Sequence, residues 1–313
     1  MIQIEKTPKV SVCVITYNQE KYIRQCLQSI VNQQTDYDFE VIVGDDCSTD
    51  DTRLIVQEFA QNYPQKIRII LQENNTGGTK NYLDVHAAAC GKYVAHIDGD
   101  DLMFQGKLEA QSQILDSDPA CTAVWHRVDF FDDAGGYCSG NGADLSPFSN
   151  GTVHFEDAIR LGYVSVHSSL MYRRSSARNP ELSGADILDV YRTWDLLSSG
   201  SGYILNDVLG AYRVSATGSI SANSHAKMSR LAIEHAKHFL KTYPEKREAF
   251  FLFSISNAII NAKNIRLTTF CFLKFAIRIF VFVSPQKIIS NLRDKRRIQV
   301  PWKKREQRPL QEK

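Results

Sequence analysis

The chain has 313 residues, of which 43% are hydrophobic and 23% are charged. This composition allows a substantial buried core and excludes a disordered protein. The formal net charge is only +2, so no global excess of positive charge points to a nucleic acid as partner.

The seven cysteines are odd in number, scattered along the chain and without any Cys-x-x-Cys spacing. This pattern argues against a disulfide framework and against a zinc site, and it fits a reducing cytoplasm. The N-terminal residues carry no apolar stretch long enough for a secretory signal. We therefore expect the protein to act inside the cell.

Strands and helices alternate in the first third of the chain. A β-branched run predicts a buried strand at 10–16, and apolar residues spaced three and four apart predict a helix from Ile23 to Val31. The alternation continues with strands at 39–44, 67–71 and 93–97 and with helices at 51–62 and 79–90. This order is typical of a doubly wound, mostly parallel α/β sheet.

The pattern changes beyond residue 104. We expect a helix at 104–116, a strand at 122–131, a turn at Gly135-Gly136 and shorter elements to about residue 214. From about residue 224 the sequence predicts helices, interrupted near Pro244, Pro285 and Pro301. The chain therefore divides into an expected α/β domain at 1–222 and a basic helical extension at 223–313.

Polar residues follow four of the predicted strands at the point where each strand ends. In parallel sheets, ligands bind outside these carboxyl ends. The segments are Thr16-Tyr17-Asn18, Asp45-Asp46, Glu73-Asn74-Asn75 and Asp98-Gly99-Asp100-Asp101. We expect all four to face one crevice.

The last of these segments places three carboxylates at the end of a buried strand. Two carboxylates about 4 Å apart repel each other by roughly 4 kcal/mol at an effective dielectric constant of about 20. A chain that brings three together must protonate one, separate them or bind a cation, and oxygen ligands favour Mg²⁺ or Mn²⁺. The alternative is that Asp101 only caps the helix that follows.

Four segments in this order resemble the family 2 glycosyltransferases, whose nucleotide-sugar domain is called the GT-A fold. The segments are 10–18, 41–50, Asn75 to Asn81 and 98–101, and the resemblance spans about residues 8–220. It implies a metal-dependent, inverting glycosyltransferase that uses Mn²⁺ or Mg²⁺. The expected donor is a nucleoside diphosphate sugar, UDP-linked by preference, and the expected acceptor is a hydroxyl of a cell-surface glycan or a lipid-linked glycan. The Gln-x-x-Arg-Trp motif of processive members is absent, which favours one sugar per binding event.

The resemblance also implies roles for single residues. Asp101 and Asp100 are the expected metal ligands, and Asp100 and Asp98 are expected to contact the ribose or the sugar. Tyr17 offers an aromatic face for a base, and Asp46 resembles the aspartate that accepts the N–H of a uracil. The expected nucleotide-sugar-binding residues are Thr16, Tyr17, Asn18, Asp46, Asn75, Gly77, Lys80, Asp98, Asp100 and Arg213.

Structural roles stay open for several of these residues. Tyr17 could be a core tyrosine, Asp46 could cap the next helix, and Arg213 could form an ion pair in place of holding phosphate oxygens. An inverting transfer also needs a base for the acceptor hydroxyl. The segment 186–195 is similar to the family stretch that carries this base; Asp189 is the expected catalytic base, and Asp186 and Asp195 compete with it.

The end of the chain combines apolar and basic residues. Residues 268–284 are mostly apolar and aromatic, but Lys274 and Arg278 interrupt them on one helical face. The apolar stripe on the other face is Phe272, Phe275, Ala276, Ile279 and Val283. Residues 286–313 hold ten Lys or Arg against three acidic residues. An interfacial helix on an anionic membrane surface, through residues 268–313, would place the protein peripherally on the inner face of the cell membrane. The alternative is an ordinary amphipathic helix packed on the catalytic domain.

A second class of function is also open. The chain could be a catalytically inactive nucleotide-sugar-binding or scaffold subunit of a polysaccharide assembly complex. Transfer or hydrolysis of a UDP-sugar in the presence of Mn²⁺ separates this class from the enzyme.

Overall fold

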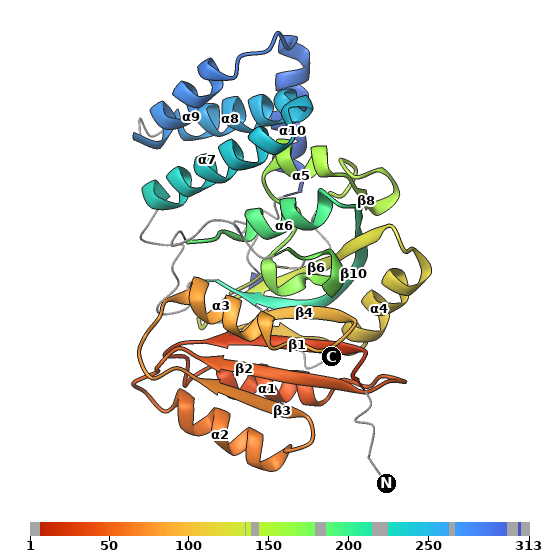
Figure 1. Cartoon of the computed structure of the whole chain (residues 1–313). Helices are drawn as coiled ribbons and strands as arrows, with labels where there is room; N and C mark the ends of the chain where they lie inside the picture. The colour runs from red at the N-terminus through yellow and green to blue at the C-terminus, as the bar shows by residue number, and fades with distance from the viewer. Residues whose placement is uncertain are drawn as a thin grey trace.

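A single mixed sheet runs through the part of the protein that the structure describes (Figure 1). The computed structural model describes residues 7–134, 136–138, 144–178, 186–214, 225–262, 267–298 and 306–307. Within these residues the strands are β1 (Val10–Thr16), β2 (Phe39–Asp45), β3 (Ile67–Leu71), β4 (Tyr93–Asp98), β5 (Leu102–Met103), β6 (Cys121–Phe131), β7 (Gly136–Cys138), β8 (Thr152–Val153), β9 (Met171–Arg173), β10 (Ser201–Arg213) and β11 (Glu306–Gln307).

The parallel half of the sheet confirms the prediction. Strand β1 lies between β2 and β4 and runs parallel to both, and β3 continues the parallel order beside β2. The expected and observed bounds of these strands agree to within one residue. The central strands are buried on both faces, as the continuous apolar runs at 10–16 and 39–44 require.

Helices cover both faces of this half. Alternate residues of β1 divide between them: Val12 and Val14 face the cluster that contains Ile23 and Leu27, whereas Cys13 faces the cluster that contains Val85. The helices are α1 (Ile23–Val31), α2 (Thr52–Asn62), α3 (Gly78–Ala87), α4 (Lys107–Ser117), α5 (Phe155–Leu161), α6 (Asp189–Leu197), α7 (His225–Thr242), α8 (Arg247–Ala262), α9 (Leu267–Arg278) and α10 (Pro285–Arg297). The doubly wound α/β architecture is confirmed.

Beyond β4 the sheet departs from simple alternation. The short strand β9 is inserted antiparallel between β4 and β6, and the long strand β10 runs parallel to β6 with three shifts of register. The turn expected at Gly135-Gly136 is occupied in part by β7, which begins at Gly136. The sheet is therefore mostly parallel rather than wholly so.

Helices α7 to α10 are stacked beyond α5 and α6, at the end of the molecule opposite β3 and α2 (Figure 1). They share a core with the sheet domain, because the Trp194 ring of α6 contacts the rings of Phe239, Phe250 and Phe253 edge-on at 5.5 to 5.7 Å. The domain boundary predicted at residue 222 and the interruption near Pro301 lie outside the described residues.

The inner face of α9 is packed against the protein, as the alternative of an ordinary amphipathic helix predicts. Phe272, Phe275, Ala276 and Ile279 are buried against the rest of the protein, which is the packed arrangement and not a membrane-facing one. Among the described residues, no helix combines the length and apolar character needed to cross a bilayer.

Candidate active site

The carboxyl ends of β1, β2 and β4 meet at one edge of the sheet. Thr16 is paired with Asp45, and Ile15 is paired with Asp98. The segments after these strands therefore lie side by side, as expected for 16–18, 45–46 and 98–101. Segment 73–75 follows β3, whose last residue Leu71 pairs with Asp45.

The segment Asp98-Gly99-Asp100-Asp101 is a tight turn, which we call the acidic turn. The backbone N–H of Asp101 donates to the carbonyl of Asp98 at 3.0 Å, and the N–H of Gly99 donates to the carbonyl of Ile15 at 3.0 Å. A Cβ atom at residue 99 would lie 2.5 Å from Gln19 Oε1 and 3.0 Å from Thr16 Cβ. Only glycine lets the turn pass this close to β1.

The acidic turn carries more negative charge than its surroundings neutralise. Burial raises the pKa of Asp98 to about 6, and burial together with repulsion from Asp98 raises the pKa of Asp100 to about 6. Burial, followed by repulsion from Asp100 and Asp98, raises the pKa of Asp101 well above its usual range. Arg213 lowers the pKa of Asp100 in part, and the buried Lys107 is a second nearby cation, but burial lowers the pKa of Lys107 to about 7.

Asp101 is hydrogen-bonded to Arg213, the last residue of β10. Its Oδ1 atom accepts the backbone N–H of Arg213 at 2.8 Å, whereas its Oδ2 atom is buried without a hydrogen-bond partner. The side chain of Arg213 donates to the carbonyl of Asp100 at 3.0 Å and pairs with Asp133 at 2.6 Å. Its guanidinium also lies between the rings of Tyr22 and Phe131, at 4.3 and 4.2 Å from their centroids. Arg213 therefore forms the ion pair that was the alternative to a phosphate-binding role, and its contact to phosphate stays a prediction.

Asp98 is connected to a buried chain of hydrogen bonds. His96 Nε2 lies 3.1 Å from Asp98 Oδ1, His96 Nδ1 lies 3.0 Å from His86 Nε2, and His86 Nδ1 lies 2.7 Å from the hydroxyl of Tyr172. Burial lowers the pKa of His96 to about 3 and that of His86 well below its usual range, so both imidazoles are neutral near neutral pH.

The direction of this chain follows from the donor count. An ionised carboxylate only accepts, and a neutral imidazole has one donor and one acceptor. Asp98 can therefore accept only if His96 donates from Nε2, His86 donates from Nε2 to His96, and the Tyr172 hydroxyl donates to His86. We call this set of residues the Tyr-His-His chain. It directs one N–H at one oxygen of Asp98.

Asp46 directly follows β2 and already has hydrogen-bond partners. Its carboxylate accepts hydrogen bonds from the backbone N–H and the hydroxyl of Thr76, at 2.7 and 2.8 Å, and from the N–H of Gly77 at 2.8 Å. It therefore fixes the 76–77 loop and does not cap α2, whose Thr52 N–H donates to Asp50 instead. The remaining lone pairs of Asp46 are compatible with a base N–H, and this role stays a prediction.

Tyr17 and Asn18 occupy the turn after β1. The Tyr17 side chain is 44% exposed, so it is not a core residue and its ring is open to a ligand. Asn18 adopts a positive φ of 51° and its side-chain oxygen accepts the N–H of Thr49 at 2.8 Å. Thr16 is buried, and its hydroxyl donates to Gln19 at 2.8 Å. Asn18 and Thr16 thus shape the turn on which Tyr17 is exposed.

The loop before α3 contains the other expected nucleotide-sugar-binding residues. Asn75 accepts the N–H of Gly77 at 3.2 Å, and Gly77 has a positive φ of 85° with open space around it. Lys80 is exposed and pairs with Asp84 on the same helix. An exposed ion pair of this kind is weak enough to be exchanged for a phosphate.

The three candidate bases differ sharply in their surroundings. Asp195 is buried and paired with Arg192 at 3.2 Å and Arg178 at 3.3 Å. Asp186 pairs with Lys227 at 2.5 Å. Asp189, the first residue of α6, is 72% exposed and lies 3.4 Å from Nδ1 of His167. Of the three, Asp189 alone combines an exposed carboxylate with an imidazole partner.

His167 connects Asp189 to the acidic turn. Its ring lies against that of His96, tilted by 31° with 4.0 Å between centroids, and its pKa is lowered to about 4, chiefly by burial and next by His96. Ser168, the next residue, accepts the backbone N–H of Asp98 at 3.0 Å. The segment 167–169 thereby holds the acidic turn and α6 in a fixed relation.

The residues present suit a hard divalent cation. Within the described residues, no three His, Cys, Asp or Glu side chains converge on a preformed metal site. A Mg²⁺ or Mn²⁺ site made of one or two carboxylates and completed by substrate phosphates and water needs no such group. The unpartnered Oδ2 of Asp101 and the half-buried carboxylate of Asp100 supply the oxygen ligands that such an ion prefers.

Four residues of this site were not singled out from the sequence in these roles. They are His86, His96, Lys107 and Tyr172. The signal for His96 was present, because an imidazole inside the apolar run 93–97 needs a buried partner. The identity of that partner depends on α3 and β9, which the sequence pattern does not bring together.

Comparisons with known proteins identify the family of the chain. Residues 11–178, more than half of the chain, match the sequence profile described as "Glycosyl transferase family 2". An uncharacterized protein of Mycobacterium tuberculosis is 33% identical over 210 residues, which are 67% of this chain and 60% of that protein. The chain thus spans about 60% of the length of this relative. The putative teichuronic acid biosynthesis glycosyltransferase TuaG of Bacillus subtilis is 28% identical over 69% of this chain and 82% of its own length.

Solved structures show the same fold. A crystal structure of S. aureus TarS 1–349 in complex with UDP-GlcNAc has a TM-score of 0.65 at 22% identity, and it covers 91% of this chain and 84% of its own. The mannosyltransferase PcManGT of Pyrobaculum calidifontis, in complex with GDP-Man and Mn²⁺, has a TM-score of 0.53 at 17% identity, covering 94% and 86%. With the acidic turn at the strand ends and the profile match through β1 to β9, the chain belongs to glycosyl transferase family 2.

Proposed function

We propose that this protein is a metal-dependent, inverting glycosyltransferase. It moves one sugar from a nucleoside diphosphate sugar, UDP-linked by preference, to a hydroxyl of a cell-surface glycan or a lipid-linked acceptor in the cytoplasm. The observation that carries the proposal is the acidic turn, where three carboxylates have raised pKa values and one of them, Asp101, keeps a buried oxygen without a hydrogen-bond partner. The name of the relative TuaG supports a surface polysaccharide as product.

The donor would lie across the ends of β1, β2 and β4. The exposed ring of Tyr17 stacks on the base, and Asp46 accepts a base N–H with its remaining lone pairs. Asp100 and Asp101 would hold a divalent cation, which would supply positive charge for the departing diphosphate. Asp98, oriented by His96, accepts a hydroxyl of the ribose or the sugar.

Asp189 takes the proton from the acceptor hydroxyl. Its exposed carboxylate faces solvent at the start of α6, and its partner His167 is neutral near neutral pH because burial lowers the imidazole pKa to about 4. A neutral partner leaves the carboxylate basic while fixing its position. The N–H of Ile187 donates to the Thr79 hydroxyl at 3.1 Å, so the segment before Asp189 is tied to the start of α3.

The test is turnover of UDP- and GDP-sugars by the full chain, with Mn²⁺ or with EDTA. We expect Mn²⁺-dependent release of nucleoside diphosphate, abolished in Asp100→Asn. The matched control is Asp116→Asn, which removes a carboxylate paired with Lys9 and Lys92 away from the acidic turn and leaves the rate near that of the wild type. Mn²⁺-dependent donor binding without any turnover would overturn the enzymatic proposal in favour of an inactive binding subunit.

A further inference from the structure

The outer face of α9 and the segment after it expose a set of large apolar side chains. They are Phe270, Leu273, Ile277, Phe280 and Phe282, which we call the apolar apex. Phe282 is 87% exposed and Ile277 is 68% exposed. A soluble surface rarely gathers so many large apolar groups without a partner.

Helix α9 is apolar on two opposite faces. Its inner face is buried, as described above, while Phe270, Leu273 and Ile277 follow the three- and four-residue spacing of a second stripe. An ordinary amphipathic helix presents polar residues on its outer face. The outer stripe therefore needs a partner that the inner contacts do not provide.

The surroundings of the apolar apex are cationic. Lys274 and Arg278 are exposed on the outer side of α9, next to the stripe in helical position. Residues 267–298 contain seven basic residues and one acidic residue, Asp294, which is paired with Arg160 at 2.9 Å. Of the seven, Lys287 pairs with Glu248 and Lys295 is buried, so five basic side chains remain.

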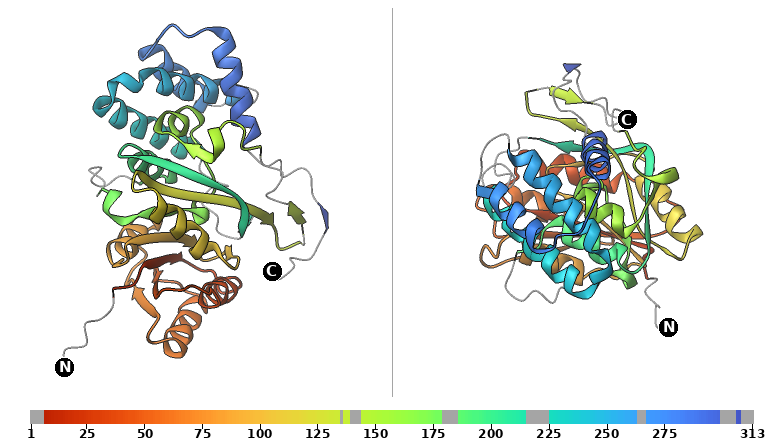
Figure 2. Two further views of the ribbon diagram at one scale, coloured as in Figure 1. Left: turned by 90° about the vertical axis from the view of Figure 1, so that its right-hand side faces the viewer. Right: turned by 90° about the horizontal axis from the view of Figure 1, so that it is seen from above.

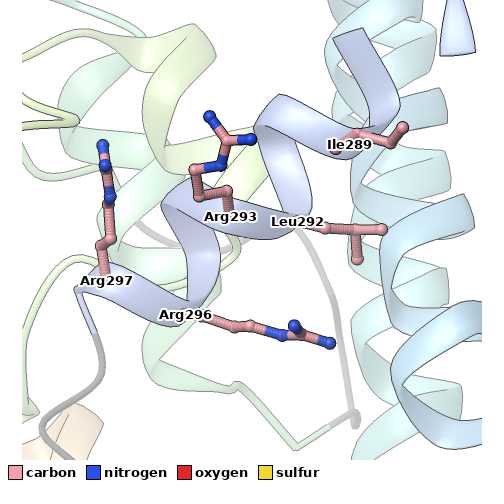
Figure 3. Close-up of a pocket in the computed structure, with 5 residues that line it drawn as sticks. All are labelled: Ile289, Leu292, Arg293, Arg296 and Arg297. Carbon is pink, nitrogen blue, oxygen red and sulfur yellow. The ribbon is translucent and has the colours of Figure 1, made fainter. Parts of the chain in front are cut away.

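Helix α10 adds an arginine-lined hollow of about 370 Å³, whose walls include Arg293, Arg296 and Arg297 (Figure 3). Ile289 and Leu292 point toward the neighbouring helices, whereas Arg293 and Arg297 point away from them (Figure 3). Arg297 is partly neutralised by Asp144 at 3.4 Å. This part of the protein therefore attracts anions and repels a second copy of the same surface.

The apolar apex lies at one end of the molecule. The segment that joins α9 to α10 forms the end farthest from α2 and β3, and α10 runs from there back toward the sheet (Figures 1 and 2). With a rise of about 1.5 Å per residue, Arg293 lies roughly 12 Å along α10 from Pro285. This distance is near the Debye length of about 8 to 10 Å, so Lys274 and Arg278 should act on a surface at the apex more strongly than the α10 arginines.

We propose that the apolar apex docks on the surface of an anionic phospholipid bilayer. Phe280 and Phe282 enter the boundary between headgroups and acyl chains, and Lys274 and Arg278 contact lipid phosphates. This docking goes beyond the proposed transfer reaction and does not depend on it. It assigns to the outer face of α9 the membrane contact that the sequence pattern suggested for its inner face.

The experiment is co-sedimentation of the full chain with vesicles of phosphatidylcholine alone and with phosphatidylglycerol added. We expect binding only to the anionic vesicles, weakened by added salt. Phe280→Ser with Phe282→Ser should lower the bound fraction at least tenfold, and Lys274→Glu with Arg278→Glu should do the same. All four side chains are exposed, so the variants should keep the wild-type far-ultraviolet circular dichroism. Because the Phe280 ring also contacts the buried Phe251 ring edge-on, the single variant Phe282→Ser should keep the wild-type melting temperature as well and still bind vesicles more weakly.

Two matched controls use the opposite end of the molecule. Leu54→Ser removes an apolar side chain of α2 that is 63% exposed, and Lys21→Glu reverses the charge of an exposed side chain before α1; both should bind vesicles as the wild type does. Absence of sedimentation with anionic vesicles would overturn the proposal. So would a concentration-dependent dimer that the Phe280 and Phe282 variant loses while vesicle binding is absent, because the surface would then belong to a second copy.

Discussion

The Nε2 atom of His96 lies 3.1 Å from the Oδ1 atom of Asp98, and the His96 side chain has no exposure to solvent. Because the Tyr-His-His chain must donate toward Asp98, His96 is a positioning residue for that carboxylate. Residues that orient a functional carboxylate in this way typically contribute about 10- to 100-fold to activity or affinity.

Replacement of His96 by leucine should therefore lower the transfer rate by about 10- to 100-fold, whereas His96→Gln should retain much of it. The amide nitrogen of glutamine can take the place of Nε2 and still donate to Asp98. Tyr93→Phe is the matched control, since Tyr93 begins the same strand and donates to Asp116. Equal transfer rates for the leucine and glutamine variants would show that hydrogen-bond donation from residue 96 to Asp98 does not determine the rate.

Asp189→Asn should lower turnover by about 10²- to 10⁴-fold, the usual contribution of a positioned base, without changing the melting temperature. Its side chain is 72% exposed, so little stability depends on it. Asp195→Asn should instead lower the melting temperature, because it leaves buried Arg192 without a charged partner. A wild-type rate for Asp189→Asn would remove it as the base and make Asp186 the next candidate.

The acidic turn makes the metal-free protein less stable as pH rises. Asp98 and Asp100 have pKa values of about 6 when folded, against about 3.9 when unfolded. Between these values the folded state binds more protons, so the stability contributed by the protonated carboxyls is present below about pH 4 and lost as pH rises to about 6.

Asp100→Asn removes part of this dependence. In EDTA near neutral pH, the variant should exceed the wild type in unfolding free energy by about 1 to 2 kcal/mol, with allowance for the partial exposure of Asp100. Below about pH 4 the two proteins should be equal. Chemical denaturation at the two pH values measures this difference, and a variant that is less stable near neutral pH would contradict the charge repulsion inferred for the turn.

Gly99→Ala should displace the acidic turn. The added Cβ would meet Gln19 Oε1 at 2.5 Å and Thr16 Cβ at 3.0 Å, and such crowding costs about 1 to 3 kcal/mol of stability. Turnover should fall further than stability, because the carboxylates move with the turn. Gly106→Ala is unsuitable as a control, because Gly106 has a positive φ of 82° that alanine rarely adopts. The control for the loss of stability is Ser11→Ala, at the other end of β1.

The sequence predicted the parallel half of the sheet because apolar runs and helical spacing are local signals. It also identified the acidic turn, since three carboxylates after a buried strand are visible without any structure. It did not predict the insertion of β9 between β4 and β6, because a strand of three residues has no periodicity to detect. The Tyr-His-His chain was missed for the same reason, as Tyr172 comes from that strand.

Helix α9 shows a second limit of prediction from the sequence. Its sequence separates Lys274 and Arg278 from a stripe that includes Phe272 and Phe275, and this stripe was the expected membrane-facing side. The structure buries that stripe and exposes the other. Hydrophobicity alone cannot say which of two apolar faces meets the protein, because that choice depends on α7 and α8, which the helix contacts.

The central claim is that the acidic turn holds a divalent cation against a nucleoside diphosphate. Calorimetric titration of UDP into the full chain, with Mn²⁺ and with EDTA, tests it most directly. We expect UDP to bind at least tenfold more tightly with Mn²⁺, and this difference to disappear in Asp100→Asn and in Asp101→Asn. Equal UDP affinity with and without Mn²⁺ in the wild type, or an unchanged Mn²⁺ effect in both variants, would contradict the claim.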